Sequence, residues 1–163
     1  MEWDGRESSG IFVGNPIGWL LRNVNSSLAL FKDNGIRSFS KVLIAIRPGR
    51  RNKRFIDVAD KICRHFGASL TLLNIVSETD SNQKIKRTEK SSTELISETK
   101  SKSIVKIIKS NNPVEAISEE SASYDLLILG TPEKDNWISV LFGAGEDRFV
   151  KKAACSVLRL TIK

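Results

Sequence analysis

The sequence predicts an α/β protein with a doubly wound, flavodoxin/Rossmann-like open sheet of five parallel strands. Short, unbroken apolar runs recur along the chain, for example at residues 41–46 and 124–130, and such runs are typical of parallel strands buried on both faces. Segments with helical periodicity separate these runs, as between Phe55 and Phe66. Because strands joined through helices pair in parallel, the alternation from residue 41 onward predicts the order β-α-β-α-β-α-β-loop-α-β.

Length and composition set the class of protein. A chain of 163 residues with 40% hydrophobic content suits one globular domain and a fraction of another. No apolar run approaches the roughly 18 to 20 residues that cross a bilayer, and the polar residues 1–4 do not open a signal peptide. The two cysteines, Cys63 and Cys155, have no paired spacing, which predicts buried thiols in a reducing, cytoplasmic compartment, with a redox-sensitive thiol as the alternative.

The charge balance favours anionic partners. The formal net charge is +7, from 26 Lys and Arg against 19 Asp and Glu, which suits nucleotides, nucleic acid or the inner membrane leaflet. The basic residues concentrate at residues 47–54 and 84–109 and do not interleave with aromatic residues. We therefore do not expect nucleic acid as a partner.

The first 35 residues are predicted as the loop, helix and strand that end a preceding repeat. Residues 17–24 have helical periodicity, residues 27–32 are predicted as a strand, and Asp33-Asn34-Gly35 as a turn. Residues 14–33 can be laid on residues 143–162 without a gap, with Gly14 opposite Gly143. The alternative is that any glycine-helix-strand pair aligns this well by chance.

Residues 36–163 are predicted as the main domain. The first strand, 41–46, leads through a basic loop, 47–53, into a helix that Gly67 ends and then into a second strand, 70–76. One face of that helix carries apolar residues at helical spacing: Phe55, Val58, Ala59, Ile62, Cys63 and Phe66.

The second half of the domain begins with a polar insertion. Residues 77–103 are rich in Ser, Thr, Lys and Glu, which predicts a mobile first half followed by a helix over about residues 91–100. A third strand is predicted at 104–109. Asn112-Pro113 then starts a helix whose Val114, Ile117 and Ala122 face inwards.

The last forty residues complete the predicted sheet. A strand at 124–130 is followed by a loop, 131–142, a helix, 146–154, and a final strand, 156–162. A glycine that ends a strand and a second glycine that begins a helix are typical of a phosphate-binding edge in an open α/β sheet.

Three segments resemble the universal stress protein family in their order and spacing. These are residues 41–46, residues 112–117 and residues 124–130 with the tail that follows, and the resemblance covers residues 41–163. It implies a flavodoxin-like five-stranded parallel sheet and a homodimer in which the last strands, residues 156–162, pair antiparallel. In ATP-binding members a G-x2-G-x9-G-[ST] signature holds the phosphates and ribose, and an Asp after the first strand contacts the adenine side.

This chain keeps the spacing of that signature and loses part of its chemistry. Gly130 and Gly143 match the first and third glycines, but Glu133 replaces the second glycine and Ala144 the hydroxyl residue. Glutamate adds a Cβ and a negative charge where a phosphate would approach the backbone, which disfavours ATP bound in the manner of the family. The Asp of the first strand is Arg47 here, a permanent donor in place of an acceptor. The candidate cofactor-binding residues are Arg47, Gly130, Thr131, Gly143, Ala144 and Gly145.

No catalytic or metal-binding set is visible, so we do not expect an enzyme. His65 is the single histidine and has no second base or metal ligand nearby in the sequence. The basic loop after the first strand lies at the edge where open α/β sheets bind ligands, and it could hold a nucleotide phosphate, a cyclic dinucleotide or another anion. The alternatives are a solvated loop or a contact with anionic lipid. Trp137 and Phe142 could stack on a base or close the edge of the core.

The resulting hypothesis is a non-catalytic regulatory and dimerisation domain with a degenerate nucleotide site. The tail at residues 1–35 resembles the junction between tandem stress-protein domains in the cytoplasmic C-terminal region of membrane transporters, such as APC-type amino-acid and cation permeases or cation/proton antiporters. The resemblance implies a cytoplasmic domain tethered to the inner face of the membrane, with the transmembrane part of the parent protein as a partner. The alternatives are a free-standing stress protein that binds ATP, AMP or cyclic di-AMP, and a purely structural dimerisation module.

Overall fold

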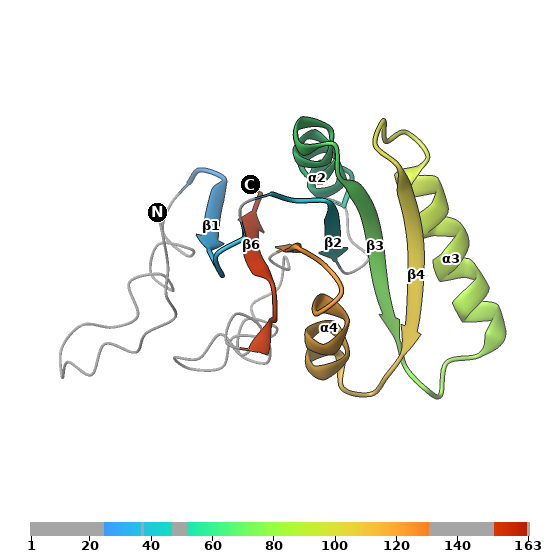
Figure 1. The fold of residues 1–163 in the computed structure, drawn as a ribbon. Helices are drawn as coiled ribbons and strands as arrows, with labels where there is room; N and C mark the ends of the chain where they lie inside the picture. The colour runs from blue at the N-terminus through green and yellow to red at the C-terminus, as the bar shows by residue number, and fades with distance from the viewer. Residues whose placement is uncertain (1–24, 37, 47–51, 131–151, 163) are drawn as a thin grey trace.

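The computed structural model describes residues 25–36, 38–46, 52–130 and 152–162 (Figure 1). The expected helix at 17–24 and the expected loop at 131–142 lie outside the described residues, as does all of the expected helix at 146–154 except its last three residues. The described strands are β1 (Leu28–Lys32), β2 (Lys41–Ala45), β3 (Ser69–Val76), β4 (Ser103–Lys109), β5 (Leu126–Gly130) and β6 (Ser156–Thr161). The described helices are α2 (Asn52–Phe66), α3 (Asn82–Ile96) and α4 (Pro113–Ser121).

The strands form one six-stranded sheet in the order β1-β6-β5-β2-β3-β4. The five strands from β2 to β6 pair in parallel, which confirms the predicted doubly wound α/β fold. β1 adds a sixth strand, antiparallel to β6, with Leu28 opposite Thr161 and Lys32 opposite Val157. In Figure 1 β1 lies beside β6 at one end of the sheet, and β4 lies at the other end beside α3. Residues 27–32, predicted as the strand that ends a preceding repeat, thus pair with the last strand of the main domain within the chain.

Helices cover both faces of the sheet because successive side chains of a strand point to opposite faces. Val42 and Ile44 face α2 and α3, where they form a buried cluster with residues of both helices. Leu43 and Ala45 point the other way and pack with Ile117 of α4. The central strands are thus apolar without interruption, as parallel strands buried on both faces require.

Helix α2 packs the predicted apolar face against the sheet, with one exception. Phe55, Ala59 and Cys63 are buried, and the helix ends at Gly67, whose φ of 68° is the left-handed conformation that glycine adopts at low cost. The prediction that Phe66 faces the core is wrong, because 47% of its surface is exposed. Phe66 is the last residue of the helix, and its ring meets Phe39 edge to face with the ring centroids 5.0 Å apart.

The expected bounds of the helix at 91–100 were wrong, because α3 begins at Asn82 and ends at Ile96. Ser81 caps its first turn by accepting a hydrogen bond from the Lys84 backbone N–H at 3.3 Å. Only Ser92 and Ile96 are buried on this helix. Most of the stretch expected to be mobile is therefore regular structure. The prediction failed because Ile85, Leu95 and Ile96 are the only large apolar residues between 77 and 103, a composition that is also typical of mobile segments.

Helix α4 starts where the sequence predicts. Asn112 caps it by accepting from the Glu115 backbone N–H, and Pro113 occupies the first turn. Ile117 is buried, as expected, but Ala122 is exposed and Ala116 is buried in its place. The difference arises because the helix ends at Ser121, which removes Ala122 from the inward-facing stripe.

Candidate functional site

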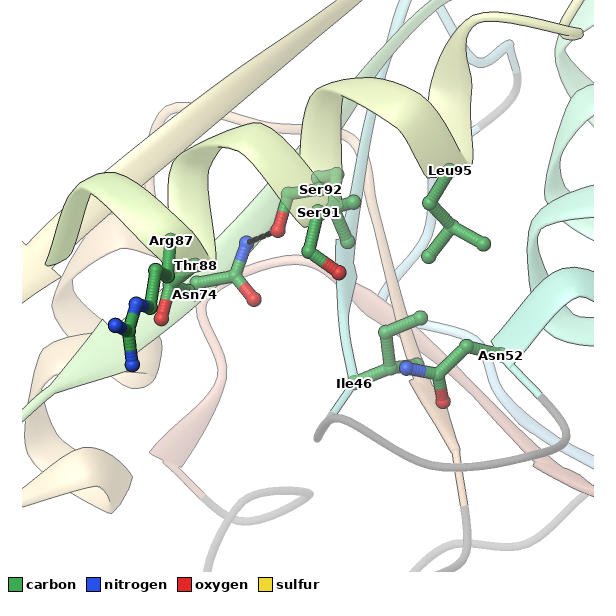
Figure 2. Close-up of a pocket in the computed structure, with 9 residues that line it drawn as sticks. Ile46, Asn52, Asn74, Arg87, Thr88, Ser91, Ser92 and Leu95 are labelled. Atoms are coloured by element: carbon green, nitrogen blue, oxygen red, sulfur yellow. Dashed lines mark hydrogen bonds between the residues drawn. The ribbon is translucent and has the colours of Figure 1, made fainter. Parts of the chain in front are cut away.

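A pocket lies at the carboxyl ends of β2 and β3, under helix α3 (Figure 2). Its volume is about 350 Å³, within the range of roughly 300 to 1,000 Å³ that is typical of small-molecule sites. The lining residues are Ile46, Asn52, Leu72, Asn74, Arg87, Thr88, Ser91, Ser92 and Leu95. The carboxyl edge is where open α/β sheets bind their ligands.

The register of the strands explains which side chains reach this pocket. Leu72 and Asn74 are two residues apart on β3 and point to the same face, and Ile46 continues the α2-facing side of β2. Arg87, Ser91 and Leu95 recur every fourth residue on α3, so they form one stripe along the helix. Asn52 joins the lining as the first residue of α2.

The pocket contains a buried polar pair. The side-chain Nδ2 of Asn74 donates a hydrogen bond of 2.9 Å to Oγ of Ser92, and only 7% and 6% of the two residues is exposed. In Figure 2 the amide nitrogen meets Ser92, whereas the amide oxygen points away from it into the space between α3 and Ile46. The pair fixes the plane of the Asn74 amide at the back of the pocket.

Gly130 is the one predicted cofactor-binding residue that lies in the described part of the chain. It ends β5, next to β2 in the sheet. A Cβ at this position would lie 3.1 Å from Ile46 Cγ2 and 3.2 Å from the ring of Phe55, closer than ordinary van der Waals contact. Packing against α2 therefore favours a glycine here, independently of any phosphate. Ile46 touches this position and also lines the pocket, so the end of β5 adjoins the pocket.

The other predicted site residues, Arg47, Thr131, Gly143, Ala144 and Gly145, lie outside the described residues. The same holds for Glu133, Trp137 and Phe142. Asn74, Arg87, Thr88 and Ser91 were not among the predicted site residues. One signal was available for Asn74, because it is an amide between the apolar residues Leu73 and Ile75 of a buried strand.

One carboxylate holds the two helices beside the pocket together. Asp60 of α2 accepts hydrogen bonds from the backbone N–H groups of Lys100, at 3.0 Å, and Ser101, at 2.8 Å, just after α3, and from the Ser101 hydroxyl at 2.8 Å. Arg64 adds an ion pair at 3.1 Å. Burial opposes ionisation, but the bonds from Ser101 and Lys100 and the charge of Arg64 outweigh it and lower the pKa of Asp60.

The two cysteines are buried free thiols, as predicted. Burial, with a smaller effect of the Asp60 charge, raises the pKa of Cys63 to about 11, and burial also raises the pKa of Cys155. Both groups therefore stay protonated at neutral pH, and the thiolate is the reactive form. This argues against the redox-sensitive alternative.

His65 is exposed on α2, with its ring edge to face against Phe66 at 4.8 Å. Within the described ranges, no three His, Cys, Asp or Glu side chains gather as a metal site would require. No helix in the same ranges has the length and hydrophobicity of a membrane span.

Comparisons with known proteins agree on one family. A model of the universal stress protein family matches residues 38–160. None of the curated proteins matches the chain. Solved structures of universal stress proteins match at 14 to 19% identity, which shows a shared fold.

Three of these structures were solved with nucleotides. The universal stress protein from Archaeoglobus fulgidus in complex with dAMP has 14% identity and a TM-score of 0.58, covering 74% of this chain and 97% of that one. A universal stress protein in complex with cAMP has 15% identity and a TM-score of 0.59, covering 75% and 97%. A family protein from Arabidopsis thaliana with AMP bound has 15% identity and a TM-score of 0.51, covering 76% and 92%.

Proposed function

Because this chain belongs to the universal stress protein family, we propose that it is a non-catalytic regulatory domain that binds an adenine nucleotide. The observation that carries the proposal is the pocket of about 350 Å³ between β2, β3 and α3, beside the end of β5 at Gly130. Structures of the same fold hold dAMP, cAMP and AMP. The nucleoside would occupy this pocket, with its phosphate directed toward the end of β5.

The sequence favours a monophosphate over a triphosphate. Glu133 and Ala144 stand where ATP-binding members have a glycine and a hydroxyl residue. A carboxylate near the β- and γ-phosphates repels them, whereas a single phosphate needs fewer donors. Arg87 in the pocket lining supplies a cation, and Arg47 follows β2 in the sequence.

The chemistry of the lining supports a binding role. Its described residues carry one cation, two amides, three hydroxyls and three aliphatic side chains, and no carboxylate, imidazole or thiol. General acid–base and nucleophilic catalysis require such groups within hydrogen-bond reach of the reacting atoms. We therefore propose that the bound nucleotide acts as a signal that stabilises one state of the domain.

A transporter is our proposed setting for this domain. The pairing of β1 with β6 within the chain supports it, because a strand that precedes the domain occupies the outer edge of the last strand, as a tandem arrangement of two repeats would place it. The domain would then lie on the cytoplasmic side of the membrane and transmit the state of its pocket to the transmembrane part. The alternative is a free-standing nucleotide-binding stress protein.

Isothermal titration calorimetry with AMP, cAMP and ATP tests the nucleotide proposal. We expect AMP and cAMP to bind, and we expect the affinity for ATP to be lower by about tenfold or more, because of the charge of Glu133.

Ser91→Trp should abolish binding, since Ser91 is exposed and lines the pocket, and an indole there fills it. Thr93→Trp is the matched control, because Thr93 is exposed on the same helix outside the lining. An absence of heat with every adenine nucleotide, or full binding by Ser91→Trp, would contradict the proposal.

A further inference from the structure

Asn74 is a polar residue at a position where packing alone would favour an apolar one. It lies on β3, two residues after the fully buried Leu72, and it faces the same side of the sheet. Its side chain is nine-tenths buried, and a buried amide costs free energy unless its donor and acceptor find partners. A role at the pocket would explain why this strand carries an amide.

The hydrogen bond made by the Asn74 amide nitrogen determines which atom of the amide faces the pocket. Nδ2 donates to Ser92 Oγ at 2.9 Å, and Ser92 is itself buried on α3. The amide group is planar, so fixing its nitrogen toward the helix directs its oxygen the opposite way. Figure 2 shows that oxygen facing the space between α3 and Ile46. The back of the pocket thus presents a hydrogen-bond acceptor.

We propose that Asn74 reads the base of the bound nucleotide and selects bases that present an exocyclic amino group. This inference rests on the proposed function, since it assumes that a nucleotide occupies the pocket. The 6-amino group of adenine is a donor that matches the Asn74 oxygen. A purine with hydrogen at that position leaves the buried oxygen without a partner, and one with a 6-oxo group places two acceptors face to face. Sites built to hydrogen-bond a ligand reject analogues that lack the matching group.

The aliphatic side chains of the pocket lining are consistent with the binding of a planar base. Leu72 lies on β3, Leu95 on α3 and Ile46 at the end of β2, so the lining that contains Asn74 also carries three aliphatic side chains. The faces of a base can pack on such side chains while its edge meets the amide. Arg87, one turn of α3 before Ser91, belongs to the same stripe and is exposed. We assign it no role in reading the base, because an exposed cation does not distinguish an amino group from a hydrogen.

Calorimetry on the full chain tests this assignment with AMP and with purine riboside 5′-monophosphate, which has hydrogen in place of the 6-amino group. The wild-type chain should bind AMP about 10- to 100-fold more tightly. Asn74→Leu should bring the two affinities to within about twofold of each other. Gln83→Leu is the control, because it removes an exposed amide of α3 that lies outside the pocket lining, and it should keep the preference for AMP. Should Asn74→Leu fail to fold, Ser92→Ala serves instead, since it frees the Asn74 amide to rotate and should weaken the preference.

The possible outcomes separate this inference from the proposed function. Equal binding of both nucleotides by the wild-type chain, with binding lost in Ser91→Trp, would overturn the role of Asn74 and leave the nucleotide pocket in place. A preference for AMP that survives Asn74→Leu would also overturn it. Tighter binding of IMP than of AMP would show that the amide presents its nitrogen, and would contradict the assignment. No binding of any of these nucleotides would overturn both proposals.

Discussion

Single side chains hold together the elements that flank the pocket. Asp60 links α2 to the turn after α3 through three hydrogen bonds, one with Lys100 and two with Ser101, and it also pairs with Arg64 on its own helix. Asn74 and Ser92 link β3 to the middle of α3. Helix α3 buries only two residues of its own, so these polar contacts do much to fix its position. Such contacts are strong because they are partly or fully removed from water.

The contribution of Asp60 to stability should depend on pH. Its pKa is lower in the folded protein than the ordinary value of 3.8, so the folded state favours the ionised form. The stabilisation is therefore fully present above the ordinary pKa and is lost as the pH falls through the lower, folded value. Asp60→Asn should reduce the free energy of unfolding by about 1–3 kcal/mol near pH ~7, and the difference from the wild-type chain should shrink below pH 3.8.

Urea unfolding at several pH values measures this difference. Asp57→Asn is the control, since Asp57 lies on the same helix and is exposed. A constant loss of stability across the whole range would show that Asp60 acts through the shape of its side chain and not through its charge.

At the scale of elements, β1 occupies the outer edge of β6. Leu30 is buried with 4% of its surface exposed and lies opposite Arg159. Asn34, in the turn after β1, donates to the Cys155 backbone oxygen at 2.8 Å and holds the connection beside the start of β6. The homodimer expected through residues 156–162 stays a prediction. A second copy could reach that edge only if β1 left it, because each strand edge pairs with one neighbour.

Displacing β1 should therefore cause association. Leu30→Lys places a cation opposite Arg159 in a buried position, which should detach β1 and expose the β6 edge to another copy. We expect size-exclusion chromatography with light scattering to give about twice the mass that the wild-type chain gives under the same conditions. Ala29→Lys, at an exposed position of the same strand, should leave the mass unchanged. If Leu30→Lys has the same mass as the wild-type chain, β1 is not what keeps a second copy away from the outer edge of β6.

At the scale of the whole molecule, the doubly wound topology decides where the pocket forms. The parallel strands β2 and β3 end at the same edge of the sheet, and α2 and α3 cover the same face, so residues far apart in the sequence meet there. The opposite face is occupied by α4 and its cluster. A ligand in the pocket would contact both α3 and the start of α2. Its binding would therefore act on the position of these two helices relative to each other.

The proposed setting in a transporter makes a prediction about the gene. If the domain regulates a membrane transporter, the reading frame that encodes it should continue upstream into several hydrophobic spans of about 20 residues each. Sequencing the genomic region that encodes the chain checks this. A frame without such spans would favour the free-standing nucleotide-binding protein.

The sequence by itself determined the parallel sheet, the positions of its strands and the end of α2 at Gly67. These features follow from apolar runs, helical periodicity and backbone conformation, which are local along the chain. It also identified Gly130, although the close packing of Ile46 and Phe55 that favours a glycine there appears only in the folded chain.

Only the tertiary structure decided the bounds of α3, the pairing of β1 with β6 and the meeting of Asn74 with Ser92. The bounds of α3 were missed because the helix buries only Ser92 and Ile96, so few apolar residues mark it. The other two features depend on contacts between distant segments. Polar contacts between distant segments leave no periodicity in the sequence, because a hydrogen bond depends on where two groups lie in space and not on their spacing along the chain.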